Sequence, residues 1–160
     1  MNPDRQRPLE EDPNPAYRLG EDGRVPTALP AALAGPAAAA FADLAESGPS
    51  PRRFELAFLP VLDDARYGVV YVRGSGGTLY FGFGIDLELR GAALTVELAW
   101  RLQEGYDELP GVPGPLHPMC SPGHGHPAEA TLTGDEAWWV CPETGTPLAR
   151  IGEYRAPAGD

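Results

Sequence analysis

The side chains best suited to chemistry lie in one short part of this 160-residue chain. Its three histidines, His117, His124 and His126, and its two cysteines, Cys120 and Cys141, all fall between positions 117 and 141. Thiolate sulfur and imidazole nitrogen are the ligands that zinc prefers in proteins. The spacing therefore makes this segment a candidate zinc site.

The two cysteines are the natural thiolate ligands, and we expect His124 and His126 to fill the other two places, with His117 as an alternative. Cys120 and His124 form a local pair separated by three residues. The Cys-Pro-x-x-Gly sequence from Cys141 resembles the turn of a zinc-ribbon knuckle, although Thr144 stands where a ribbon has its second cysteine.

The same residues also fit other descriptions. In a metal-free interpretation, Cys141 is a small buried apolar residue and the histidines lie on an exposed loop packed beneath Trp138 and Trp139. Full ligation by four protein groups would make zinc structural, whereas three ligands and a water would permit hydrolysis. A cysteine–histidine catalytic pair would need contact between the two groups, and no family signature surrounds them.

Composition narrows the class of protein. The net charge of −11 repels phosphate backbones, which argues against nucleic-acid binding and would suit a basic protein partner. No apolar run is long enough to cross a membrane, and the first residues lack the apolar core of a signal peptide. We therefore expect a cytoplasmic protein whose cysteines are thiols or ligands rather than a disulfide.

Four segments follow from changes in composition. Residues 1–26 are rich in proline and charge and predict a disordered tail, and residues 27–109 predict an α+β domain. Residues 110–127 form a loop rich in proline and glycine, and residues 128–155 predict a C-terminal β-hairpin module.

Hydrophobic periodicity gives the elements of the α+β domain. A helix is expected over 37–46 with Pro36 in its first turn, and a second one follows Gly91 and ends before Pro110. Between them, strands are expected over 54–62, 67–73 and 79–90, the last with strict alternation of apolar and polar residues.

Short connections between these strands favour an antiparallel β-meander flanked by the two helices, in the order α-β-β-β-α, with a C-terminal β-hairpin that would be zinc-ribbon-like if metal binds. By its topology this arrangement resembles the secretion-chaperone-like domains, small acidic modules of helices and sheet that bind other proteins. The resemblance in topology does not define an activity.

A second resemblance covers about a third of the chain. It comprises the helix with Gln103-Glu104-Gly105-Tyr106, the proline-rich Cys/His loop, Ala137-Trp138-Trp139-Val140-Cys141-Pro142, and Ala149-Arg150-Ile151-Gly152. These features resemble uncharacterised small acidic proteins of high-GC actinobacteria. The resemblance implies no activity.

Trp138 and Trp139 are neighbours, so in a strand they point to opposite faces. We expect one of them in the core and the other at a rim, where it would anchor a partner protein. The sequence thus favours a non-enzymatic protein-interaction or accessory module with a structural zinc. The alternatives are an immunity or inhibitor protein that neutralises a basic toxin, and a small zinc- or thiol-dependent enzyme.

Overall fold

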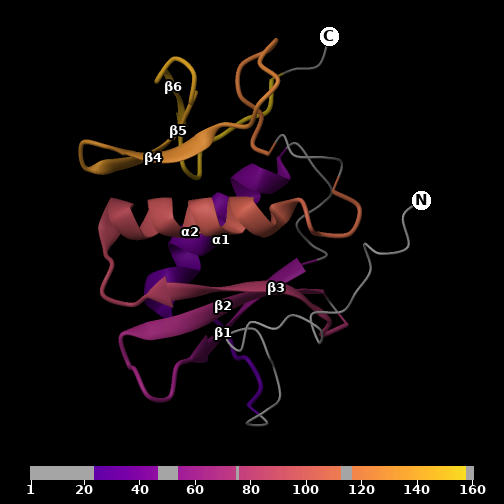
Figure 1. Ribbon diagram of the computed structural model, residues 1–160, viewed down its shortest axis with the longest axis vertical. Coiled ribbons are helices and arrows are strands. Elements are labelled where there is room, and N and C mark those ends of the chain that lie inside the picture. The colour runs from indigo at the N-terminus through magenta and orange to yellow at the C-terminus, as the bar shows by residue number, and fades with distance from the viewer. Residues whose placement is uncertain (1–23, 47–53, 75, 113–116, 158–160) are drawn as a thin grey trace. The chain divides into compact units, whose positions relative to one another are not determined.

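The computed structural model describes residues 24–46, 54–74, 76–112 and 117–157, so most of the predicted 1–26 tail lies outside the described residues. It confirms the α+β class, with two helices and six antiparallel strands in two sheets (Figure 1). In chain order the elements are α1 (Ala31–Ala45), β1 (Phe54–Pro60), β2 (Tyr67–Gly74), β3 (Leu79–Asp86), α2 (Gly91–Tyr106), β4 (Glu129–Thr133), β5 (Glu136–Val140) and β6 (Pro147–Arg150). Among the described residues, no helix is long and apolar enough to cross a membrane.

The described residues form two compact units. The first unit, unit 1, contains residues 24–29 and 54–87, and the second, unit 2, contains residues 30–46 and 88–157 apart from the gap at 113–116. Both helices and the C-terminal strands therefore belong to unit 2. The predicted meander makes up most of unit 1 and lies in the sequence between the two parts of unit 2, whereas residues 24–29 of unit 1 precede both.

Unit 1 is the predicted antiparallel meander, with the strand order β1-β2-β3. Two glycines let aromatic rings lie flat across neighbouring strands. A Cβ atom on Gly82 would come within 2.6 Å of the Tyr71 ring, and one on Gly68 would overlap the ring of Phe58. These positions need glycine because the rings occupy the space that a side chain would fill.

Strand β3 ends at Asp86, four residues before the predicted end. Its alternation is present as expected, since Phe83 and Ile85 are buried. The strand ends there because Asp86 pairs with Tyr67, the first residue of β2, so the chain beyond it has no strand to pair with.

Helix α1 begins at Ala31, earlier than predicted, and contains Pro36 in its interior rather than in its first turn. A proline inside a helix normally clashes with the residue before it and removes one hydrogen bond. Here the preceding residue is Gly35, which has no Cβ atom, and this eases the clash. The expectation that Pro36 lies in the first turn of this helix was wrong for this reason.

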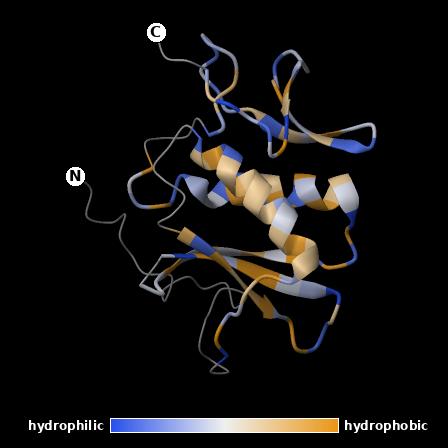
Figure 2. Cartoon of the chain, turned by 180° about the vertical axis from the view of Figure 1, so that it is seen from behind, coloured by the Kyte–Doolittle hydropathy of each residue, from blue (hydrophilic) through white to orange (hydrophobic). Residues whose placement is uncertain are grey.

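Unit 2 packs the two helices together and places α2 against β4 and β5. Leu94, Leu98 and Leu102 form the buried stripe of α2 that the sequence predicts, and Phe41 of α1 meets Tyr106 of α2 edge to face, with ring centroids 5.9 Å apart. Figure 2 shows apolar residues on both helices and on strands of each sheet. The predicted C-terminal hairpin is a three-stranded antiparallel sheet in the order β4-β5-β6.

A buried carboxylate fastens α1 to the C-terminal part of unit 2. Asp43 is 2 % exposed and accepts a hydrogen bond of 2.8 Å from Trp139 Nε1, together with bonds from the backbone N–H groups of Gly152 and Tyr154. Burial raises the pKa of the Asp43 carboxyl, and the three N–H donors oppose that shift. The Asp43 side chain thus satisfies three donors at once.

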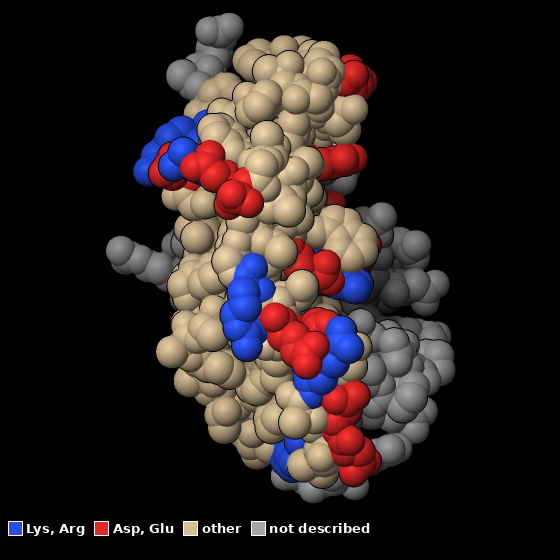
Figure 3. All heavy atoms as spheres, turned by 90° about the vertical axis from the view of Figure 1, so that its left-hand side faces the viewer, with Lys and Arg blue, Asp and Glu red and all other residues tan. Residues whose placement is uncertain are grey.

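Charged side chains on the surface are largely interleaved. Figure 3 shows acidic and basic groups lying next to one another on the pictured face, separated by wide uncharged areas. Within α2, Arg101 pairs with Glu97 at 2.9 Å and lies 3.7 Å from Glu104, and between strands Arg150 pairs with Glu136. Such exposed pairs contribute little to stability.

Candidate metal site

Three of the predicted ligands lie on one closed loop, residues 117–128. The backbone N–H of Ala128 donates to the carbonyl of Pro118 at 3.0 Å, and Met119 forms an isolated β-bridge with Pro127. The Gln103 side-chain amide on α2 donates to the carbonyls of both His117 and Ala128. The two ends of the loop are therefore tied to each other and to the helix.

The fourth ligand lies on the turn that follows β5. The N–H of Cys141 donates to the carbonyl of Thr146 at 2.9 Å, and the N–H of Gly145 donates to the carbonyl of Cys141 at 2.8 Å. Gly145 has a φ of 70°, a conformation that favours glycine. This is the tight turn that the Cys-Pro-x-x-Gly sequence predicts.

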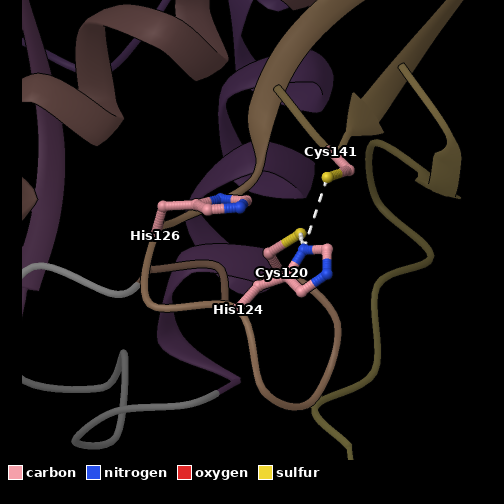
Figure 4. Close-up of side chains that lie close together, drawn as sticks. All are labelled: Cys120, His124, His126 and Cys141. Carbon is pink, nitrogen blue, oxygen red and sulfur yellow. Dashed lines mark hydrogen bonds between the residues drawn. The ribbon is translucent and has the colours of Figure 1, made fainter. Parts of the chain in front are cut away.

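The loop and the turn bring their ligands together. One donor atom from each of Cys120, His124, His126 and Cys141 lies within 4.8 Å of all the others (Figure 4). His124 Nδ1 is 3.5 Å from the sulfur of Cys120 and 3.5 Å from that of Cys141. Both sulfurs are buried and both imidazoles are partly buried, so the cluster is shielded from water on the thiol side.

These distances match those between the ligands of a tetrahedral zinc ion. Zinc–sulfur bonds of about 2.3 Å and zinc–nitrogen bonds of about 2.05 Å place a sulfur and a nitrogen ligand about 3.6 Å apart, and two sulfurs about 3.8 Å apart. The two 3.5 Å contacts of His124 Nδ1 agree with the first value. All the remaining separations are 4.8 Å or less, so the four donor atoms lie close enough together to surround one ion.

The hydrogen bonding of His126 favours the same conclusion. Its Nδ1 lies 3.0 Å from the carbonyl of Pro127, which can only accept a hydrogen bond, so this nitrogen carries a proton and Nε2 carries the lone pair in the neutral ring. Metal-bound histidines commonly donate their second ring N–H to a backbone carbonyl in this way. Nε2 is buried and makes no hydrogen bond to any described residue, although a Glu143 carboxylate oxygen lies 3.5 Å away. A metal ion would satisfy this orphaned acceptor.

The two thiols differ in acidity. The Thr144 side chain is the main cause that lowers the pKa of Cys141 to about 6, against the effect of burial and with help from the backbone N–H groups of Thr144 and Glu143. Burial raises the pKa of the Cys120 thiol, and the backbone N–H of Ser121 opposes that rise. Thr144 thus stands where a ribbon has its second cysteine and instead stabilises the thiolate of Cys141.

His117, the alternative ligand, lies outside this cluster. It is 4 % exposed, and its ring packs against Tyr106 with centroids 5.2 Å apart. Neither ring nitrogen has a hydrogen-bond partner among the described residues. Burial lowers the pKa of His117, and the nearby carboxylate of Asp107 opposes that shift, so the ring is neutral.

The two tryptophans proposed to bind a partner have different environments. Trp139 is fully buried and bonded to Asp43, so it is a core residue and cannot contact a partner. Trp138 is partly exposed on the opposite face of β5, with the Arg150 guanidinium 5.6 Å from the centre of its ring. The expectation that one of the pair is core is confirmed by Trp139, and Trp138 is the one left at a partly exposed position.

Sequence reasoning missed the residues that support the site, namely Gln103, Tyr154 and Asp43. Gln103 lies on the polar side of an amphipathic helix, where nothing distinguishes it from a solvated side chain. Comparisons with protein-family models, with characterised proteins and with solved structures find no match to this chain.

Proposed function

We propose that Cys120, His124, His126 and Cys141 bind one zinc ion, and that this ion is structural. The observation that carries the proposal is the convergence of two sulfurs and two imidazole nitrogens within 4.8 Å of one another, with His126 Nε2 buried and without a hydrogen-bond partner among the described residues. Soft thiolates combined with imidazoles in this geometry favour zinc over magnesium or calcium.

Four protein ligands leave no position for water or substrate, which is the arrangement of structural zinc sites. The ion would join the 117–128 loop to the turn after β5. It would thereby stabilise unit 2 in the manner of other small metal-bound modules, whose folding depends on the metal. A zinc enzyme would need one of the four groups to be displaced.

The test is metal analysis of the untagged full-length protein, purified without chelator, beside three variants. Cys120→Ser and Cys141→Ser each remove one thiolate and should lose the zinc and melt at a lower temperature. His117→Phe removes the third histidine, which lies outside the cluster, and should retain one equivalent of zinc per chain. Cobalt substitution should give the visible spectrum of a tetrahedral site with thiolate ligands.

Absence of zinc from the parent, even after addition of excess metal under reducing conditions, would contradict the proposal. So would full zinc content in both cysteine variants. A loss of zinc in His117→Phe alone would show that the ligand set is different.

A structural ion does no chemistry, so we further propose that the protein acts by binding another protein. The supporting observation is the face of the second sheet that carries Trp138 and Arg150, residue types that often dominate the energy of protein interfaces. The net charge of −11 favours a basic partner.

This second proposal is tested with a matched pair of variants in co-purification from the source cells. Trp138→Ala should lose the partner, whereas Leu132→Ala should retain it, because Leu132 is also exposed but points to the other face of the sheet. Equal recovery of the same partner by both variants would contradict a role for the Trp138 face.

A further inference from the structure

The segment that follows β6 connects the metal-binding loop to helix α1. The Tyr154 hydroxyl donates a hydrogen bond of 2.9 Å to the carbonyl of Met119 on the loop. The backbone N–H of Tyr154 donates to Asp43 Oδ1 at 3.2 Å, and the N–H of Gly152 donates to Oδ2 of the same carboxylate. One residue, Tyr154, therefore contacts both the loop and the helix.

The contact of Tyr154 with the loop lies next to Cys120, one of the candidate metal ligands. The Met119 carbonyl belongs to the peptide group whose nitrogen is that of Cys120, so the bond from Tyr154 fixes the orientation of that peptide. Tyr154 is 4 % exposed and Cys120 is 3 % exposed. The bond itself is partly buried, because Met119 is 36 % exposed, but the donor side chain is buried, so loss of the bond leaves a change that the buried tyrosine must accommodate.

We propose that Tyr154 is a positioning residue of the metal site, and that zinc binding and the docking of residues 152–157 on α1 stabilise each other. The proposal rests on the proposed zinc site. Zinc would fix the position of Cys120 and therefore the orientation of the Met119 carbonyl, which accepts the hydrogen bond from the Tyr154 hydroxyl. The tyrosine in turn keeps its own N–H and that of Gly152 in place against Asp43.

Coupling of this kind is reciprocal. If zinc favours the docked segment, the docked segment must raise the affinity for zinc by the same factor. Loss of a group that orients a metal ligand typically weakens metal binding by about 10–100-fold. Because Tyr154 acts on the peptide before the ligand rather than on the sulfur itself, we expect the lower end, about tenfold.

The first measurement is the zinc dissociation constant of full-length Tyr154→Phe, obtained by competition with a chromophoric chelator. This substitution removes the hydroxyl and keeps the ring, so the variant should fold. Tyr67→Phe is the matched control, since Tyr67 is exposed and lies in unit 1. We expect about tenfold weaker binding for Tyr154→Phe, unchanged binding for Tyr67→Phe, and a melting temperature of Tyr154→Phe that differs from the parent more with zinc than without it.

The second measurement is the rate of tryptic cleavage after Arg155, which is exposed and lies inside the docked segment. Cleavage there should be faster after zinc is removed, whereas cleavage after Arg66 in unit 1 should not change. In Tyr154→Phe, the effect of zinc on cleavage after Arg155 should be smaller.

The outcomes separate this inference from the proposed function. If the parent binds zinc, but Tyr154→Phe binds it equally well and cleavage after Arg155 does not respond to the metal, the coupling is overturned and the zinc site stands. If the parent binds no zinc, both are overturned.

Discussion

The replacement of Asp43 tests most directly how unit 2 is held together. Its carboxylate is buried and accepts hydrogen bonds from Trp139 Nε1 and from the backbone N–H groups of Gly152 and Tyr154. Asp43→Ala removes the acceptor and leaves all three donors in place. Two of them belong to buried residues, whereas Gly152 is exposed and its N–H can turn to water.

The size of the effect follows from these contacts. Each buried donor left without a partner costs about 1–3 kcal/mol, so two of them give about 2–6 kcal/mol. The substitution also removes a carboxylate whose burial is unfavourable, as its raised pKa shows, and this recovers part of the loss. We therefore expect Asp43→Ala to lower the free energy of unfolding by about 2–4 kcal/mol.

Asp43→Asn gives an internal comparison. The amide oxygen can still accept from the two donors that share Oδ2, while the NH₂ group faces the N–H of Tyr154. One hydrogen bond is lost instead of three, so we expect a loss of about 1–2 kcal/mol, smaller than that of Asp43→Ala. Asp135→Asn in the exposed β4–β5 turn is the control and should stay within about 0.5 kcal/mol of the parent.

Tryptophan fluorescence during urea unfolding is the suitable assay, because Trp100, Trp138 and Trp139 are the chain's three tryptophans and all lie in unit 2. The experiment is run with saturating zinc so that metal content does not differ between variants. If Asp43→Ala were as stable as the parent, or if Asp43→Asn lost more than Asp43→Ala, the reasoning about orphaned donors would be refuted.

Two further predictions concern packing and protonation. Gly82→Ala should lower the stability of unit 1 by about 1–3 kcal/mol, because the new methyl group meets the Tyr71 ring. Gly84→Ala on the same strand is the control, since its methyl group meets nothing within 4 Å and should leave the stability nearly unchanged. Circular-dichroism melts measure both variants, and equal effects would contradict the packing argument. Burial holds the pKa of His117 below its ordinary 6.5, so the unfolded chain binds the proton more tightly and the folded chain loses stability as the pH falls through and below 6.5. His117→Phe should therefore lose less unfolding free energy than the parent between about pH 7.5 and pH 5.5, and a steeper loss in the variant would show that His117 is not buried as a neutral ring.

Local patterns in the sequence predicted much of this fold. The alternation from Leu79 onward located β3, and the leucines at 94, 98 and 102 located the buried face of α2. Adjacent residues in a strand point to opposite faces, so the sequence also predicted that one of Trp138 and Trp139 is buried. It did not show which one, because this depends on which face of β5 meets the helices.

Sequence reasoning could not predict contacts between residues that lie far apart in the chain. The donor types of the cluster were evident, but its convergence depends on a closed loop tied by Gln103 to α2. Asp43 meets Tyr154 across 111 positions, and neither residue carries a local signal for that contact. Pro36 shows the opposite problem, because here a local signal misled. Proline predicted the start of a helix, but the helix runs through Pro36, since Gly35 before it has no Cβ atom to clash with the proline ring.

The position of the β1-β2-β3 meander between the two parts of unit 2 has a consequence for the order in which the protein folds during synthesis. Domains generally fold as units while the chain is synthesised from its N-terminus. The meander is complete once Leu87 has been added, and its strands contact neighbours close in sequence. Helix α1 is synthesised earlier, yet its carboxylate at Asp43 meets its three donors only after Tyr154 has emerged. On the ribosome, the meander can therefore form before the first helix meets either α2 or the donors of Asp43.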